Sequence, residues 1–534
     1  MKGISMKLLK NKYIMTLLLI FSGALTALPI VFPSIGFLQW VSVIPAALVL
    51  IVSADDESVK LRRMYWRGIL YFWSFYAVAL HWFFNMYPLD FVGLSNAASI
   101  AVILVACFGL SLLQASFSAF AFLFFAKINR TQMVKSFGFA KPFIAAATFV
   151  IAEWFQNVGW WGVPWGRMPI GQINSLLFVR SSALFGSYFV TFALISVNFC
   201  LAYFILSKCK QRYFVAAALS AFALNLAFGL LVTAFYKSSN ATIKVGVAQG
   251  NIASSDKWSA DTLETTKDIY RELTVKAAED GSDVVIWPET ALPYTIMESV
   301  NLSAYVKDLA KECNVTIIVS AFTEDEESGL LANSMIEVKP DGSFGEDYYS
   351  KRRLVPFGEF VPMRSFVSFV FPPLANVGML EEDLVAGEES VVIKSNVGYI
   401  GCGVCFDSIY ENIHLESVNN GAQFIAISTN DSWFGDSAAL YMHAAQSKLR
   451  AIETGRYIAR SANTGISFFV DPMGEVVGEL DILKSGYLVE DVELRTDKTL
   501  YSVIGNSFVY LCAGFAISLL VLDFMARPEK KKNK

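Results

Sequence analysis

The chain has 534 residues, of which 54% are hydrophobic, 14% aromatic and only 17% charged, and its formal net charge is −4. This apolar content is too high for an ordinary soluble protein, so the composition predicts a membrane protein. The charge balance gives no indication of a basic surface, which argues against a nucleic-acid-binding protein.

Eight apolar runs are long enough to cross about 30 Å of hydrocarbon as helices, for which roughly twenty residues are needed. They lie near residues 13–32, 36–53, 68–87, 96–126, 139–158, 181–207, 213–236 and 503–525. The run at 96–126 is longer than one span requires, so we expect it to tilt or kink.

Lysine and arginine gather in alternate connections between these runs. The basic segments are 2–12, 60–67, 127–141, 208–212 and 527–534. All of them share one side if both termini are cytoplasmic, which places residues 240–500 outside the cytoplasm. A cleaved signal peptide within the first thirty residues is the alternative, but losing one span would break this charge pattern.

The chain therefore divides into a transmembrane helical domain at 1–238, an outer domain at 239–500, and an eighth span with a basic cytoplasmic tail at 501–534. In the outer domain, strand patterns alternate with helical ones, which predicts an α/β sheet with helices packed outside it. The expected strands are 242–248, 283–287, 315–321, 333–338, 391–393, 399–405, 423–428, 466–470 and 487–492. The expected helices are 261–279, 302–312 and 438–462.

Three strand ends in this outer domain carry side chains that form a chemical set. Cys405 follows an apolar run, Glu289 closes the string Trp287–Pro288–Glu289, and Lys351 enters a loop rich in proline and glycine. A thiol needs a base to become a nucleophile, and a cation can hold an oxyanion. We therefore expect Glu289 as general base, Lys351 as oxyanion donor and Cys405 as nucleophile.

Cys402 and Cys405 also form a Cys-x-x-Cys pair, which can be a redox centre or half of a zinc site. Zinc would need further ligands, and the chain has only three histidines. A redox pair of the thioredoxin type would open a helix rather than close a strand. We therefore expect no metal, and interpret Cys402 as a packing residue of the strand.

Three strings give the chain a resemblance to a known family. They are Trp287–Glu289, the stretch 351–362 that begins Lys-Arg-Arg-Leu-Val-Pro-Phe-Gly-Glu, and the stretch 429–436 that reads Thr-Asn-Asp-Ser-Trp-Phe-Gly-Asp. In order and spacing they resemble the nitrilase-like carbon-nitrogen hydrolases, and among these the branch of bacterial apolipoprotein N-acyltransferases. The resemblance implies a Glu-Lys-Cys triad on a four-layer α-β-β-α sandwich, without a metal or diffusible cofactor.

The resemblance also implies roles for supporting residues. The amide of Phe406 would be a second oxyanion donor, and Glu359 would orient Lys351 or Glu289, its alternative being a loop salt bridge. Family members usually have Tyr-Glu after the cysteine, where this chain has Phe406 and Asp407.

Two aromatic residues match further positions of the family. They are Trp258 and Trp433, which would line an acyl or lipid path or belong to the core.

The implied reaction transfers a fatty acyl chain from a membrane phospholipid, through a cysteine thioester, to the α-amino group of diacylglyceryl-cysteine apolipoproteins. The implied location is the bacterial inner membrane, with the catalytic domain on the periplasmic side. One alternative is a membrane-tethered amidase or nitrilase that uses water as acceptor. Another is a transporter or receptor without catalysis, although the scarcity of charges within the spans argues against a transport route.

Overall fold

The computed structural model describes residues 6–89, 94–257, 259–370 and 382–526. The chain forms two compact units. The first draws on residues 1–81, 104–234 and 504–534, and the second on 82–103 and 235–503.

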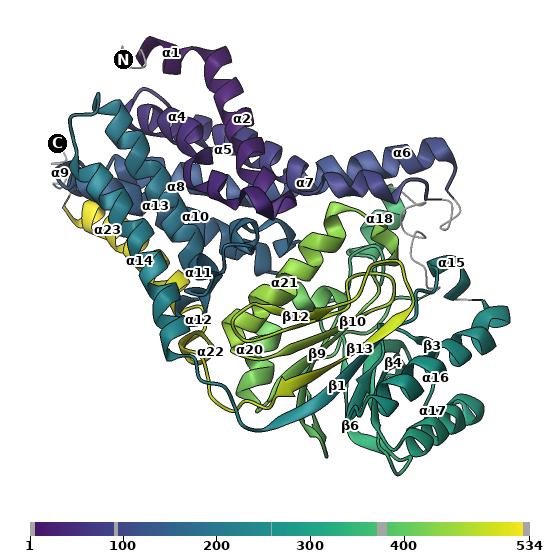
Figure 1. Cartoon of the computed structure of the whole chain (residues 1–534). Helices are drawn as coiled ribbons and strands as arrows, with labels where there is room; N and C mark the ends of the chain where they lie inside the picture. The colour runs from purple at the N-terminus through teal and green to yellow at the C-terminus, as the bar shows by residue number, and fades with distance from the viewer. Residues whose placement is uncertain (1–5, 90–93, 258, 371–381, 527–534) are drawn as a thin grey trace. The chain divides into compact units, whose positions relative to one another are not determined.

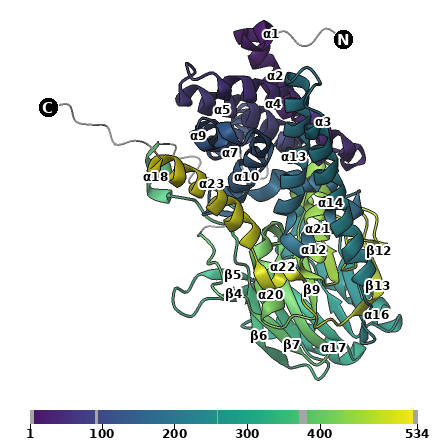
Figure 2. The ribbon, with the colours of Figure 1, turned by 90° about the vertical axis from the view of Figure 1, so that its left-hand side faces the viewer.

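The first unit is helical (Figure 1). Its helices are α1 (Met6–Lys10), α2 (Lys12–Val31), α3 (Gln39–Ser42), α4 (Ile44–Asp55), α5 (Leu61–Ala79), α7 (Leu110–Ser118), α8 (Phe120–Asn129), α9 (Gln132–Ser136), α10 (Lys141–Trp154), α11 (Leu176–Val179), α12 (Ser182–Phe185), α13 (Ser187–Leu206), α14 (Tyr213–Phe235) and α23 (Ser507–Met525). The C-terminal α23 packs on α10 through a cluster that contains Val150, Val509 and Cys512, and Figure 2 shows both helices in this unit.

Within the described residues, seven helical segments are long and apolar enough to cross a membrane. They are Lys12–Val31, Pro33–Asp55, Asn96–Asn129, Gly138–Asn157, Ser187–Leu206, Tyr213–Phe235 and Ser507–Met525. The long segment includes α6 (Asn96–Leu104) and a π-helical turn, Val105–Gly109, which interrupts it where the sequence predicted a tilt or kink.

The expected run 68–87 is the one without a counterpart among these seven segments of the described residues; it corresponds to α5, which begins at Leu61 and ends at Ala79. The helix therefore starts within the basic segment and stops before the apolar run does, because a 3-10 helix follows at His81–Met86. Small residues allow α5 to pack closely on its neighbours: a Cβ on Gly23 of α2 would lie 2.2 Å from the carbonyl oxygen of Tyr71. Such close backbone contact is typical of helix packing in membranes.

The second unit contains two β-sheets. The first has the order β13-β1-β2-β4-β5-β6, with β3 also paired to β4, and the second has the order β12-β11-β10-β9-β8-β7. The strands of the first sheet are β1 (Thr242–Gln249), β2 (Val284–Ile286), β3 (Leu292–Thr295), β4 (Thr316–Glu324), β5 (Leu331–Val338), β6 (Phe344–Ser350) and β13 (Gly486–Glu493). Those of the second are β7 (Val392–Ser395), β8 (Gly398–Val404), β9 (Phe424–Thr429), β10 (Ile458–Ala462), β11 (Phe468–Val470) and β12 (Val476–Glu479).

Helices cover the outer face of each sheet (Figure 1). On the first sheet, α16 (Leu263–Glu279) and α17 (Val300–Cys313) share a core that includes Leu273, Val306 and Val319. On the second, α20 (Glu411–Asn419) and α21 (Ala438–Thr454) pack on strands through residues such as Val418, Leu440 and Ile427. The predicted combination of a helical membrane domain with an α-β-β-α sandwich is therefore confirmed. The same unit also holds α15 (Ser254–Lys257), α18 (Arg364–Val370) and α22 (Leu500–Ile504).

Hydrogen bonds join the two sheets near the ends of their parallel strands. Ser428 Oγ of β9 donates to the carbonyl oxygen of Trp287, and Ser461 Oγ of β10 donates to that of Ala248, each over 2.8 Å. These bonds satisfy backbone groups that are fully buried, and they fix the end of β2 against the second sheet.

One predicted helix was wrong in its extent. The sequence favoured a helix over 438–462, whereas α21 ends at Thr454 and residues Ile458–Ala462 form the buried strand β10. Gly455 adopts φ 65° at the helix end, a left-handed cap that glycine takes without steric cost.

Candidate active site

Glu289 lies just beyond the end of β2 and is buried, with 6% of its surface exposed. Its Oε1 accepts hydrogen bonds from Asn333 Nδ2 over 2.9 Å and from Lys351 Nζ over 3.1 Å. Its Oε2 accepts one from the backbone amide of Asn430 over 2.9 Å. These contacts fix the orientation of the carboxylate, and the last one comes from the stretch 429–436.

Lys351 is the first residue after β6, and only 1% of its surface is exposed. Besides its bond to Glu289, its Nζ donates to Glu359 Oε1 over 2.6 Å. Burial alone would lower the pKa of Lys351, but the charges of Glu289 and Glu359 outweigh it and raise that pKa well above its ordinary value. The lysine therefore stays cationic, as an oxyanion donor must.

Glu359 is held on both carboxylate oxygens. One accepts from Lys351, and the other accepts from the backbone amide of Val355 over 2.8 Å. Burial raises the pKa of Glu359, and Lys351 acts in the opposite direction. The contact between Glu359 and Lys351 is largely enclosed, and the role of Glu359 in orienting Lys351 stays a prediction.

Cys405 directly follows β8 and opens the 3-10 helix η10 (Cys405–Ile409). Its backbone has φ 48°, in the left-handed region, which costs a non-glycine residue about 1–2 kcal/mol. Such strain persists only where the surrounding structure fixes it, and it is common at functional sites. Burial raises the pKa of the Cys405 thiol, as does the charge of Glu289, while Lys351 opposes the rise.

The raised pKa predicts how Cys405 reacts with an alkylating agent. A pKa above the ordinary 9.0 leaves the thiol protonated at neutral pH, so the thiolate fraction grows as pH rises. We expect the rate of Cys405 alkylation by iodoacetamide to keep rising with pH past the range in which an ordinary thiol levels off, because its pKa is raised. Peptide mass spectrometry measures this rate, with Cys405→Ala as the blank. A plateau reached near neutral pH would contradict the expectation.

Asp407 anchors the segment around the thiol. It is fully buried, and its carboxylate accepts from Tyr349 Oη over 2.8 Å, from the Arg353 amide over 2.8 Å and from the Val404 amide over 3.1 Å. It therefore links the end of β6, the loop after Lys351 and the end of β8.

Phe406 and Trp433 differ in their surroundings. The ring of Phe406 is buried against Tyr410, with centroids 5.4 Å apart, in the first turn of η10. Trp433 is half-buried in the 3-10 helix η11 (Ser432–Phe434), which follows β9. Trp258, the other predicted aromatic residue, lies outside the described residues.

Lys257 is a buried residue of this region that the sequence did not single out. Its Nζ donates to the carbonyl oxygen of Glu289 and to Thr290 Oγ1, each over 2.6 Å. Burial lowers the pKa of Lys257 to about 8, against the opposing charge of Glu289. A lysine in a polar stretch has no local signal of burial, because its acceptors lie 32 and 33 residues away.

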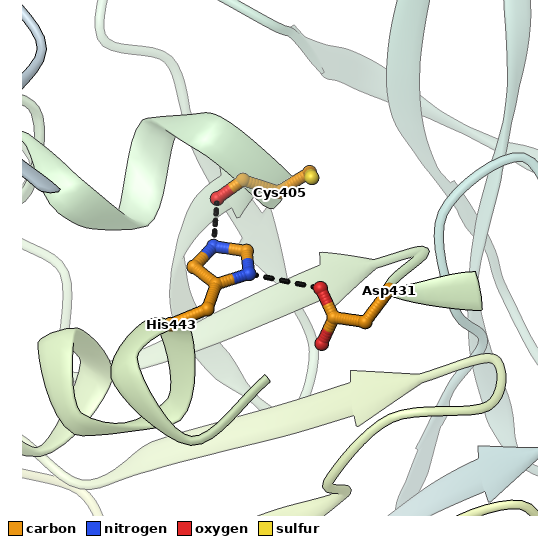
Figure 3. A group of neighbouring side chains, drawn as sticks. All are labelled: Cys405, Asp431 and His443. Carbon is orange, nitrogen blue, oxygen red and sulfur yellow. Dashed lines mark hydrogen bonds and ion pairs between the residues drawn. The ribbon is translucent and has the colours of Figure 1, made fainter. Parts of the chain in front are cut away.

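Cys405, Asp431 and His443 place potential ligand atoms within 4.8 Å of one another (Figure 3). Both ring nitrogens of His443 already have partners: Nδ1 lies 2.8 Å from Asp431 Oδ1, and Nε2 lies 3.1 Å from the carbonyl oxygen of Cys405. Figure 3 shows the Cys405 sulfur turned away from the imidazole. The geometry is that of a hydrogen-bonded support for Cys405 and fits a metal site poorly.

Comparisons with known proteins agree with this architecture. Residues 244–498 match the family model described as carbon-nitrogen hydrolase, and residues 22–200 match the apolipoprotein N-acyltransferase N-terminal domain. A solved member of branch 10 of the nitrilase superfamily from Saccharomyces cerevisiae is 17% identical, covers 50% of this chain and 95% of its own, and has a TM-score of 0.39. Residues 244–498 therefore form a carbon-nitrogen hydrolase domain.

Two curated relatives extend the match to most of the chain. An apolipoprotein N-acyltransferase from Gloeobacter violaceus is 29% identical over 501 residues, 93% of this chain and 92% of the relative. Another, from Geobacter metallireducens, is 30% identical over 374 residues, 68% of this chain and 70% of the relative. The chain belongs to the apolipoprotein N-acyltransferase family. Together with its apolar helices, this makes it a bacterial membrane protein.

Proposed function

We propose that this acyltransferase moves a fatty acyl chain from a membrane phospholipid to the N-terminal α-amino group of a diacylglyceryl-cysteine apolipoprotein. The observation that carries the proposal is the buried contact between Glu289 and Lys351, beside a strained Cys405, in a hydrolase domain joined to an N-acyltransferase membrane domain. Both substrates are anchored in the bilayer, so a membrane-embedded enzyme meets them where they reside.

In the first half-reaction Glu289 takes the proton of the Cys405 thiol, and the thiolate attacks an acyl ester of the phospholipid. A tetrahedral oxyanion forms, which Lys351 and the Phe406 amide stabilise. Its collapse breaks the ester bond, and the leaving lysophospholipid oxygen takes the proton back from Glu289. The products are a Cys405 thioester and a lysophospholipid.

In the second half-reaction the α-amino group of the apolipoprotein attacks the thioester, and Glu289 accepts a proton from the amine. The carbon–sulfur bond breaks and Glu289 returns its proton to the sulfur, which leaves an amide on the lipoprotein and the free thiol on Cys405. Because Glu289 serves both halves, it must be held in one place, and its three side-chain contacts do so.

The proposal places the catalytic domain, residues 239–500, on the periplasmic side of the inner membrane. Both termini are then cytoplasmic, with residues 1–238 as the transmembrane domain and residues 501–534 as the last span and tail. The support is the distribution of lysine and arginine, which gathers in the segments assigned to the cytoplasm.

A transfer assay with a blocked acceptor tests the function. The enzyme is incubated with phospholipid carrying an isotope-labelled acyl chain and with a diacylglyceryl-cysteine lipopeptide, whose amine is either free or acetylated. We expect one labelled acyl group on the free amine, an equal amount of lysophospholipid, and no labelled product with the acetylated peptide. Release of labelled fatty acid at the same rate with both peptides would instead indicate a hydrolase.

A further inference from the structure

His443 supports the main chain of Cys405. It lies on α21, is buried, and places Nε2 3.1 Å from the Cys405 carbonyl oxygen. The same carbonyl accepts from Ser408 Oγ over 2.7 Å. A residue in the left-handed region needs such support, because its backbone would otherwise relax.

A buried ion network fixes the imidazole. Its Nδ1 lies 2.8 Å from Asp431 Oδ1, and Arg460 Nη2 donates to Asp431 Oδ2 over 2.8 Å. Burial alone would raise the pKa of Asp431, but Arg460 and His443 hold it well below its ordinary value. Asp431 is therefore an anion that requires hydrogen-bond donors on both oxygens.

Four groups surround the imidazole. Nδ1 lies 2.8 Å from Asp431 Oδ1 and 3.1 Å from Arg460 Nη2. Nε2 lies 3.1 Å from the Cys405 carbonyl oxygen and 2.9 Å from Ser408 Oγ, which donates to the same carbonyl. The ring therefore joins the Asp431–Arg460 ion pair to the main chain of Cys405.

We propose that His443 is a positioning residue: held by Asp431, it donates from Nε2 to the carbonyl of Cys405 and so keeps the nucleophile in its left-handed conformation. Figure 3 shows the sulfur turned away from the ring, which separates this role from that of a base acting on the thiol. The inference rests on the proposed function of Cys405 as the nucleophile.

The test compares a variant that keeps a donor with one that has none. His443→Leu removes both hydrogen bonds, whereas His443→Gln can still present an N–H to the carbonyl. In single-turnover reactions with phospholipid we expect His443→Leu to lower the rate of thioester formation by about 10- to 100-fold, as when a buried acceptor loses its donor. The KM for phospholipid should stay within about twofold, and His443→Gln should recover most of the rate.

Two controls separate this role from a structural one. Tyr441→Phe changes an exposed residue on the same helix, α21, and should leave the rate unchanged. Thermal unfolding shows whether each variant folds.

Two results would overturn the inference: equal loss of rate in His443→Leu and His443→Gln when both are folded, or a full rate in His443→Leu. Failure of the proposed function is recognised separately. In that case the wild-type protein itself forms no thioester, so the rates of the His443 variants have no reference rate.

Discussion

Replacing Cys405 by alanine is expected to lower acyl transfer to a diacylglyceryl-cysteine lipopeptide by about 10⁴-fold or more, because no other group can carry the acyl chain between the substrates. The change removes one sulfur atom from a half-buried position, so the protein should remain folded. Initial rates with labelled phospholipid measure the effect.

Cys402 provides the matched control. It is the neighbouring cysteine and is buried in β8. The proposed mechanism gives it no part in the reaction. Cys402→Ala should therefore keep transfer within about threefold, the cost of a small core change. Equal loss in both variants would favour a Cys402–Cys405 redox pair and contradict the nucleophile assignment.

Glu289→Gln is expected to lower the same rate by about 10²- to 10⁴-fold, the usual contribution of a general base. Glutamine keeps the size of the side chain but cannot take the thiol proton. Loss should appear in kcat, since the carboxylate acts on the reacting atoms and holds no remote part of the lipid. Steady-state kinetics across phospholipid concentrations separates kcat from KM.

Glu298 offers a control on the same stretch of chain, because it is exposed. Glu298→Gln should leave the kinetics unchanged, and both variants should unfold at similar temperatures. If Glu289→Gln raised only KM, the carboxylate would serve lipid binding, and another group would be the base.

The main features of the fold could be predicted because their signals are local. An apolar run followed at once by a polar side chain marks the end of a buried strand, and Glu289 and Cys405 each follow such a strand. Lys351 follows β6, which is polar and largely exposed, so its signal is the loop rich in proline and glycine after it. The structure adds the contact between Glu289 and Lys351, 62 residues apart in sequence. Their catalytic roles stay predictions.

The remaining features depend on partners distant in sequence. Strand β10 carries Arg460, and a charged residue at this position made the segment look like the polar face of a continuing helix. In the structure Arg460 is buried, and its charge is paired with Asp431, which lies 29 residues earlier. The sequence alone assigns no role to His443, because nothing in its own helix shows that it reaches the Cys405 carbonyl. Similarly, the basic residues at the start of α5 have the hydropathy of a loop, so the sequence placed the beginning of this helix too late. Hydropathy does not include the packing of α5 against α2.

The measurement that tests the central claim most directly is the intact mass of purified protein after incubation with phospholipid alone. We expect a mass increase of one fatty acyl chain in wild type, its loss on treatment with hydroxylamine, which cleaves thioesters, and no increase in Cys405→Ser. Absence of the adduct in an active, lipid-extracted preparation, or an adduct that persists in Cys405→Ser, would contradict a thioester on Cys405.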